Sequence, residues 1–245
     1  MHRRGRYSAL SVGISFGGGQ KACNLTLLQA IFQITYLQHP QNLRHEGAAA
    51  RVLATLLNHI AFIRLAEFAS GAFAAWALPF FQYYAEHLKA LLLSDDSLIL
   101  NFANSIFCAC TFNFGPKTAT FEHTDSGNLP FGWCSVTALG RFNPKQGGHL
   151  ILWDLKLVIE FPPGSTILFP SAILRHSNTP IGCGETRYSF TQYTSGGLFR
   201  WVDQGLQLSE DYWSQLSDAE HDAALRTRAG RWAMGLGLYC LYAYT

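Results

Sequence analysis

The sequence predicts an α+β protein in which helices flank one core of antiparallel β-strands. Three features lead to this prediction: an Ala- and Leu-rich first part, a middle part of short β-prone runs separated by Gly and Pro, and a helical pattern near the end. The 245 residues are 49% hydrophobic and 14% charged, which is enough apolar material for a substantial core. A globally disordered chain is therefore excluded.

The first part, from about residue 24 to 93, has a helical pattern. In Ala48–Phe68, apolar positions recur at steps of three and four residues, as one buried helix face requires. The members of this face are Val52, Leu56, His59, Ile60 and Ile63. A second helix is expected over Gly71–Leu93, kinked or split by Pro79. The uncharged stretch Phe68–Ala85 is interrupted by polar residues and Pro, so a buried helix is expected there in preference to a membrane span.

The middle part, from about residue 98 to 195, is expected to form the β core. Its runs are short and bounded by Gly and Pro, which is typical of strands. The expected strands are Thr118–Glu122, Trp133–Leu139, His149–Trp153, Leu157–Phe161, Ser165–Phe169 and Arg187–Tyr193. The connections are too short for helical crossovers, so the strands are expected to form an antiparallel sheet pair or a barrel.

The last part, about residues 209 to 232, returns to helix. Ser217-Asp218-Ala219-Glu220 has the pattern of a capping box at a helix start. The inner side of this helix is expected to carry Ala224, Leu225 and Trp232. Because the sequence contains no internal repeat and no low-complexity linker, we predict a single domain over residues 1–245.

Charge and cysteine content exclude several classes of protein. Eighteen Lys and Arg against sixteen Asp and Glu give a net charge of +2, so any nucleic-acid contact must depend on a local patch. The six cysteines have irregular spacing without a C-x-x-C pair, which favours reduced thiols over a zinc or disulfide framework. They are Cys23, Cys108, Cys110, Cys134, Cys183 and Cys240. The basic N-terminus lacks the apolar run of a signal peptide, so secretion is not expected.

A candidate metal site lies in the β half. In His123-Thr124-Asp125, residues two apart on a strand would point to the same face, so imidazole and carboxylate could reach one metal. His176 would complete two histidines and one carboxylate, the facial triad of non-haem Fe(II) oxygenases. The alternative is that His123 and Asp125 only hydrogen-bond each other at a strand end.

A candidate anion site follows on the run Arg187–Tyr193. Strand alternation puts Arg187, Ser189, Thr191 and Tyr193 on one face. Burying an unpaired guanidinium costs on the order of several kcal/mol, so this face is better explained as the wall of an anion pocket than as ordinary core. A guanidinium matches a carboxylate in bidentate geometry, and the Ser189 hydroxyl adds a donor.

An H-x-D pair, a distal His and an R-x-S motif in this order are typical of 2-oxoglutarate- and iron-dependent dioxygenases of the double-stranded β-helix fold. The alternative is an unrelated jelly roll with incidental polar residues. Four segments further resemble fungal TET/JBP-like dioxygenases, which occur in mushroom-forming fungi, often beside Kyakuja–Dileera–Zisupton transposons. These segments are Val12–Gln20, Gly127–Cys134, Gly147–Asp154 and Phe190–Gly197. The resemblance runs from about Ser11 to Trp232.

The resemblance implies a double-stranded β-helix (jelly-roll) core flanked by N-terminal and C-terminal helices. It implies that His123, Asp125 and His176 are the catalytic metal ligands for Fe(II), with O2 and 2-oxoglutarate as co-substrates. Arg187 and Ser189 would hold the distal carboxylate of 2-oxoglutarate, and His149 would make a further contact to it. The implied substrate is a methylated DNA base flipped from the duplex, 5-methylcytosine or N6-methyladenine, which in turn implies a nuclear protein.

Two sets of residues are candidates for contacts with this substrate. Asn128, Phe131 and Trp133 follow the metal-binding pair and could grip a flipped base, although the aromatic pair could instead pack in the core. Gly18, Gly19 and Gln20 could approach a phosphate through their backbone, or could form a plain loop. The basic residues Arg3, Arg4 and Arg6 could trail along the DNA backbone or form an unstructured tail.

Other functions stay open from the sequence. The same chemistry could act on RNA, a nucleoside or a protein, which the small net charge fits somewhat better. A decayed copy could be a binding module without activity, but the three metal ligands and Arg187 are all present. No membrane and no obligate protein partner are expected. The chain departs from the family at Lys21–Asn24, which lacks an expected Pro-Gly, and at Met234–Thr245, which is more apolar than expected.

Overall fold

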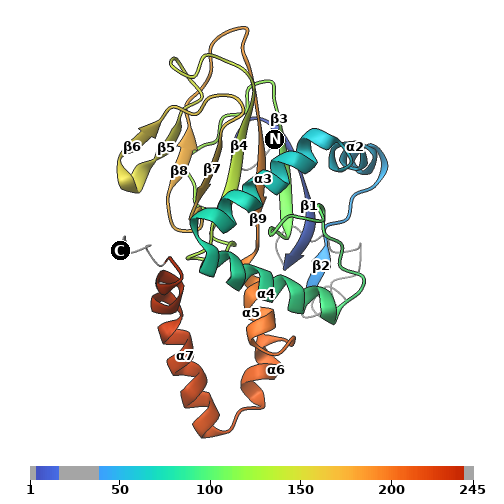
Figure 1. The fold of residues 1–245 in the computed structure, drawn as a ribbon, viewed down its shortest axis with the longest axis vertical. Helices are drawn as coiled ribbons and strands as arrows, with labels where there is room; N and C mark the ends of the chain where they lie inside the picture. The colour runs from blue at the N-terminus through green and yellow to red at the C-terminus, as the bar shows by residue number, and fades with distance from the viewer. Residues whose placement is uncertain (1–3, 17–38, 240–245) are drawn as a thin grey trace, which may run out of the picture.

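Two antiparallel sheets form the centre of the protein. The structure, a computed structural model, describes residues 4–16 and 39–239. A six-stranded sheet has the order β2-β1-β3-β9-β4-β7, and a three-stranded sheet has the order β6-β5-β8 (Figure 1). The strands are β1 (Ser8–Phe16), β2 (Pro40–Asn42), β3 (Ala109–Phe114), β4 (Cys134–Arg141), β5 (Leu150–Leu152), β6 (Leu157–Ile159), β7 (Thr166–Phe169), β8 (His176–Asn178) and β9 (Thr186–Tyr193).

Helices precede and follow this β core in the chain. The preceding helices are α2 (Gly47–Leu57), α3 (Ile60–Trp76) and α4 (Leu78–Ser94), and those that follow are α5 (Gly196–Asp203), α6 (Ser209–Ser214) and α7 (Asp218–Gly237). Figure 1 shows α3 and α4 crossing the large sheet, while α6 and α7 extend away from both sheets. The predicted α+β class is thus observed.

Apolar side chains gather in three clusters that fix the layers. One fills the space between the sheets and includes Ala138, Leu150 and Phe169. A second joins the outer face of the large sheet to α2 and α3, where Phe190 of β9 meets Phe62 with ring centroids 5.3 Å apart. The third joins α3, α4 and α5. One face of β9 is therefore used for packing, which leaves the other free for polar side chains.

The predicted helix over Ala48–Phe68 is wrong in its continuity and in its buried face. The chain breaks at Asn58–His59, where the His59 side chain caps α3 by accepting a hydrogen bond from the Ala61 N–H at 3.2 Å. The break shifts the helical phase, so Val52 and Ile60 are 42% and 64% exposed and His59 is exposed as well. Leu53 is buried in their place, and Leu56 and Ile63 are half-buried.

The split predicted at Pro79 is confirmed. Helix α3 ends at Trp76, Ala77 lies between the two helices, and Pro79 occupies the first turn of α4. A missing backbone N–H costs nothing there because no intrahelical acceptor is available. Among the described residues no single helix is long and apolar enough to span a membrane. Helices α2 and α3 together reach that length and apolar composition, but they are bent by 66° relative to each other.

Five of the predicted strands are confirmed as β4, β5, β6, β7 and β9. Thr118–Glu122 is not a strand: it lies between isolated bridges at Lys117 and His123. Strands β1, β2, β3 and β8 were not predicted, and β2 lies within the first part of the chain, which was expected to be helical. Strand β3 alternates in polarity, with Phe112 on the packed face and Thr111 and Asn113 on the cleft face, so its pattern was available in the sequence. Strands β2 and β8 have three residues only, which is too short for a pattern to show.

The predicted capping box is confirmed at the start of α7, where the Ser217 N–H donates to the Glu220 carboxylate at 2.9 Å. The predicted inner side is only partly correct: Ala224 is half-buried, whereas Leu225 and Trp232 are 42% and 45% exposed. Most of α7 stands away from the core, and its buried residue is Gly235. Cys108, Cys110, Cys134 and Cys183 are free thiols.

Candidate metal centre and co-substrate site

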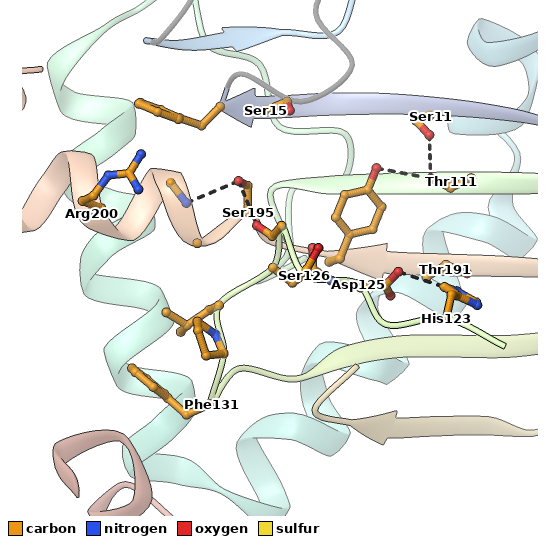
Figure 2. Close-up of a pocket in the computed structure, with 18 of the residues that line it drawn as sticks. Ser11, Ser15, Thr111, His123, Asp125, Ser126, Phe131, Thr191, Ser195 and Arg200 are labelled. Atoms are coloured by element: carbon orange, nitrogen blue, oxygen red, sulfur yellow. Dashed lines mark hydrogen bonds and ion pairs between the residues drawn. The ribbon is translucent and has the colours of Figure 1, made fainter. Parts of the chain in front are cut away.

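Three side chains suited to metal binding converge at one end of the β core. One ligand atom each from His123, Asp125 and His176 lies within 4.8 Å of the others. The Asp125 carboxylate is 3.7 Å from His123 Nε2 and 4.0 Å from His176 Nε2. Figure 2 shows the His123 and Asp125 side chains beside each other in the pocket. Two imidazoles and one carboxylate are a donor set that suits Fe(II) and leaves coordination positions open.

Backbone carbonyls fix the orientation of both histidines. His123 Nδ1 is 2.7 Å from the Phe121 carbonyl oxygen, and His176 Nδ1 is 2.9 Å from that of Leu174. Because a carbonyl oxygen can only accept, each Nδ1 carries the proton. Each Nε2 then presents its lone pair towards Asp125, as a metal ligand must.

Burial keeps these histidines neutral. Burial, reinforced by the neighbouring His176, lowers the pKa of His123 from 6.5 to about 4. Burial also lowers the pKa of His176, against the opposing attraction of Asp125. Only a neutral imidazole binds a metal, so both rings are in the required state near neutral pH.

Backbone pairing brings the three ligands together across fifty residues of sequence. His123 and His176 exchange two backbone hydrogen bonds of 3.1 and 2.9 Å, and the Asp125 N–H donates to the Ser171 carbonyl at 2.8 Å. The expectation that His123 and Asp125 share one face of a strand is wrong, because His123 forms only an isolated bridge and Asp125 lies in a loop. The pairing with His176 sets the convergence instead.

Arg187 is fully buried and has unused donors. Its Nη1 donates to the Thr118 carbonyl at 2.8 Å, whereas Nε and Nη2 have no hydrogen-bond partner. Burial lowers its pKa to about 10, which still leaves it protonated near neutral pH. Two unsatisfied N–H donors on one buried guanidinium are what a carboxylate accepts in bidentate geometry. The donor set fits the distal carboxylate of 2-oxoglutarate, and Arg187 itself lies behind the cleft surface, since it has no exposed area and is not among the lining residues.

The inner face of β9 continues this polar surface. Ser189, Thr191 and Tyr193 line the central cleft, as the alternation of the strand predicts, while Phe190 packs on the other side. Asn113 of β3 donates its side-chain N–H to the Ser189 hydroxyl oxygen at 3.0 Å. The Ser189 O–H is then left to donate to an incoming anion.

A cleft of about 1650 Å³ connects the metal ligands to the C-terminal helices. Figure 2 shows Arg200 of α5 at the other end of the pocket from His123. The charged side chains that line the cleft among the described residues are five arginines and two aspartates, a local balance of +3. They are Arg4, Arg44, Arg200, Arg228 and Arg231, with Asp125 and Asp203. This balance exceeds the +2 of the whole chain, so the charges that line the cleft favour anions over cations.

Two residues that precede β1, Arg4 and Tyr7, lie at the site, although neither was predicted to be near the metal ligands. Arg4 Nη1 lies 2.7 Å from Asp125 Oδ1, and the Arg4 carbonyl accepts a hydrogen bond from the Phe121 N–H at 2.7 Å. Tyr7 lies near Arg187, and burial raises its pKa to about 12. The missed signal was β1 itself, since without that strand the preceding residues appeared to be a free tail.

Of the remaining predicted site residues, some line the cleft and others do not. Asn128 and Phe131 line the cleft, and Asn128 donates to Ser171 Oγ at 3.2 Å. Trp133 packs in the core against Phe73, with ring centroids 5.0 Å apart, so for this residue the alternative of core packing is correct. His149 is not among the residues lining the cleft, and its backbone and ring bond to Thr179. Gly18, Gly19 and Gln20 lie outside the described residues.

No family model matches the chain, and a search of curated proteins found no significant match. Among solved structures, NgTET1 in complex with 5mC DNA aligns with a TM-score of 0.50 at 18% identity, over 64% of this chain and 56% of that chain. A 2OG-Fe(II) oxygenase family protein from Burkholderia pseudomallei aligns with a TM-score of 0.36 at 15% identity, over 77% of this chain and 66% of that chain. This chain thus spans little more than half the length of NgTET1.

The likeness to NgTET1 shows the fold. The chain has a double-stranded β-helix fold similar to that of NgTET1, which confirms the predicted fold class. It carries this fold together with an intact H-x-D and distal His triad, the combination typical of Fe(II)- and 2-oxoglutarate-dependent oxygenases.

Proposed function

We propose that the protein is an Fe(II)- and 2-oxoglutarate-dependent dioxygenase that oxidises the methyl group of a methylated DNA base, 5-methylcytosine or N6-methyladenine. One observation carries the proposal: two oriented, neutral histidines converge with Asp125, and the fully buried Arg187 has two unused donors. The first group fits a metal and the second fits a carboxylate. A chain without catalytic function would not need to retain both.

Each side chain has a definite task in this reaction. Bound iron and 2-oxoglutarate together supply oxygen activation, with succinate and CO2 as products. His123 and His176 hold the metal through Nε2, and Asp125 adds the carboxylate ligand. Arg187 fixes the far carboxylate of the co-substrate, and Ser189 donates a hydrogen bond to it. Their positions decide which way the co-substrate lies in the cleft.

The proposed substrate class follows from the cleft. Its five arginines and two aspartates favour a polyanion, although the whole chain is almost neutral. Asn128 offers an amide for a base edge, and Phe131 offers apolar surface near it. The NgTET1 structure, which was solved with 5mC DNA, supports the same class. The four segments named above favour the fungal, transposon-associated group, and a DNA substrate implies a nuclear location.

The test measures co-substrate turnover and base oxidation together. Purified protein with Fe(II), ascorbate, O2 and 2-oxoglutarate is given duplex DNA that contains either methylated base, and succinate and nucleosides are quantified by mass spectrometry. Loss of one methylated base with matching succinate is the expected result and identifies the base. Succinate without loss of either base would move the substrate to RNA, a nucleoside or a protein. No turnover despite bound iron would indicate a binding module.

A further inference from the structure

One face of α7 lines the outer part of the cleft. Ala224, Thr227, Arg228, Arg231 and Trp232 of this helix line the cleft, at steps of three and four residues. The facing wall is formed by α5 and α6, which contribute Arg200, Tyr212 and Trp213. Figure 1 shows α7 and α6 extending away from the sheets as two arms joined at their far end.

Packing connects these arms to the centre of the site. Gly235 of α7 lies against the Phe131 ring, where an added Cβ would come within 2.3 Å of the ring. Tyr239 hydrogen-bonds the Phe131 carbonyl. At the other end, the rings of Trp213 and His221 pack with centroids 5.1 Å apart. Because Phe131 itself lines the cleft near Asn128, the arms hold a fixed position relative to the candidate base-binding residues.

Aromatic surface is left exposed along this wall. Trp232 is 45% exposed, and none of the described aromatic rings packs against it. Tyr212 and Trp213 are half-buried, with ring centroids 5.3 Å apart, and Trp213 also packs against His221. Exposing large rings to water is unfavourable, so rings gathered on one groove indicate a ligand with flat apolar faces.

The charges of the wall are positive. Asp203 is its one carboxylate among the described residues, and it is paired with Arg231 at 2.6 Å and with His87 at 2.8 Å. Arg228 makes no ion pair with a described residue, and Arg200 lies over the Phe16 ring at 5.3 Å. The other acidic residues of α6 and α7 do not line the cleft; they are Glu210, Asp211, Asp218, Glu220 and Asp222. Two guanidinium groups are therefore available to anions.

From this arrangement we infer that the arms formed by α5, α6 and α7 bind an unpaired nucleic-acid strand, with bases stacked on Trp232, Trp213 and Tyr212 and phosphates near Arg228 and Arg200. Stacking rings interleaved with arginines form the kind of groove that binds single strands, because every base has an aromatic face. The inference rests on the proposed function, since the strand is the one that flanks the base at the metal site. It adds a binding surface outside the β core.

The experiment measures binding of a fluorescein-labelled, unmethylated oligonucleotide of about 16 nucleotides, the upper end of a single-strand binding site. Fluorescence anisotropy is followed at several salt concentrations, without co-substrate. The variants are Arg228→Glu and Trp232→Ala. The matched controls are Arg226→Glu, on α7 but outside the cleft, and Trp76→Ala, an 81% exposed Trp at the end of α3. Melting temperatures close to that of the wild type establish that the variants are folded.

Trp232→Ala is expected to weaken binding at least about fivefold, and Arg228→Glu to weaken it and reduce its salt dependence. Both controls should bind as the wild type does. Equal losses in variants and controls, or binding of duplex but not of single strand, would overturn the inference. If methylated DNA is oxidised while both cleft variants bind normally, only this inference fails. If binding depends on Arg228 and Trp232 but neither methylated base is oxidised, the strand site stands and the proposed reaction fails.

Discussion

The site has a metal end, formed by His123, Asp125 and His176, and an arginine end, formed by Arg187. The two ends differ in how the fold satisfies their polar groups. At the metal end, His123 and His176 are held by backbone carbonyls at 2.7 and 2.9 Å, so their Nε2 atoms are oriented before any metal binds. At the other end, Arg187 makes one hydrogen bond to the protein and leaves Nε and Nη2 unsatisfied. The metal end is organised by the fold, whereas the arginine end is completed by its ligand.

This difference separates two kinds of buried polar group. A satisfied group stabilises the folded chain directly, since each buried hydrogen bond offsets the loss of water. A buried cation with unused donors lowers the stability of the ligand-free protein, and the deficit is recovered when an anion binds. Substitutions at the metal ligands, at Arg187 and at Ser189 should therefore affect stability and ligand binding in different ways.

Replacing a metal ligand should have the largest effect. His176→Ala removes one of three ligand side chains, so iron binding and succinate release should fall below detection. Iron content and succinate are measured on the same preparation. His39→Ala, an exposed histidine outside the cleft, should leave both unchanged. If His176→Ala retained stoichiometric iron, the metal end would be misassigned.

Replacing Arg187 should affect the ligand-bound and ligand-free states differently. Arg187→Met should raise the 2-oxoglutarate concentration needed for half-maximal turnover by about 30-fold or more, since truncating a buried charge pair costs on the order of 2–5 kcal/mol. The ligand-free variant should unfold no more easily than the wild type, because an unmatched buried cation has been removed. Arg141→Met, at an exposed position of β4, is the control. A large loss of stability in ligand-free Arg187→Met would contradict the view that the buried guanidinium destabilises the ligand-free protein.

The histidines should make the metal-free protein sensitive to acid. The unfolded chain binds protons near the usual histidine pKa of 6.5, while folded His123 does so only near pH 4. The unfolded state therefore binds more protons in this range, and stability is lost as the pH falls from about 6.5 towards 4. Melting temperatures across this range should show the decline, and His123→Gln should make it shallower. A flat profile in the wild type would argue against neutral, buried imidazoles.

Replacing Ser189 should have the smallest effect. Ser189→Ala removes one hydrogen bond to the co-substrate and leaves the Asn113 side-chain N–H without its acceptor, so the 2-oxoglutarate requirement should rise about five- to tenfold. Ser135→Ala is the control, because Ser135 on the neighbouring β4 is also buried but does not line the cleft, and its hydroxyl has no hydrogen-bond partner among the described residues. The same increase in both variants would indicate a general loosening of the sheet.

Sequence patterns were reliable where one strong physical signal acts locally. The alternation of β9 correctly separated Ser189 and Thr191 from Phe190, and Ser217 with Glu220 correctly placed the start of α7. They were unreliable where packing overrides a local pattern. The break at His59 shifted the buried helix face, and the three-residue strands β2 and β8 are too short for an alternation to show.

The α+β class, the polar face of β9 and the residue types that suit a metal and a carboxylate could all be predicted from residue type and periodicity. The folded structure was needed to show that His123 pairs with His176, that Arg4 reaches Asp125 and that His149 bonds to Thr179. The physical reason is that residue type and periodicity are local properties of the chain. A site assembled from segments more than a hundred residues apart depends on long-range strand pairing, which no local pattern specifies.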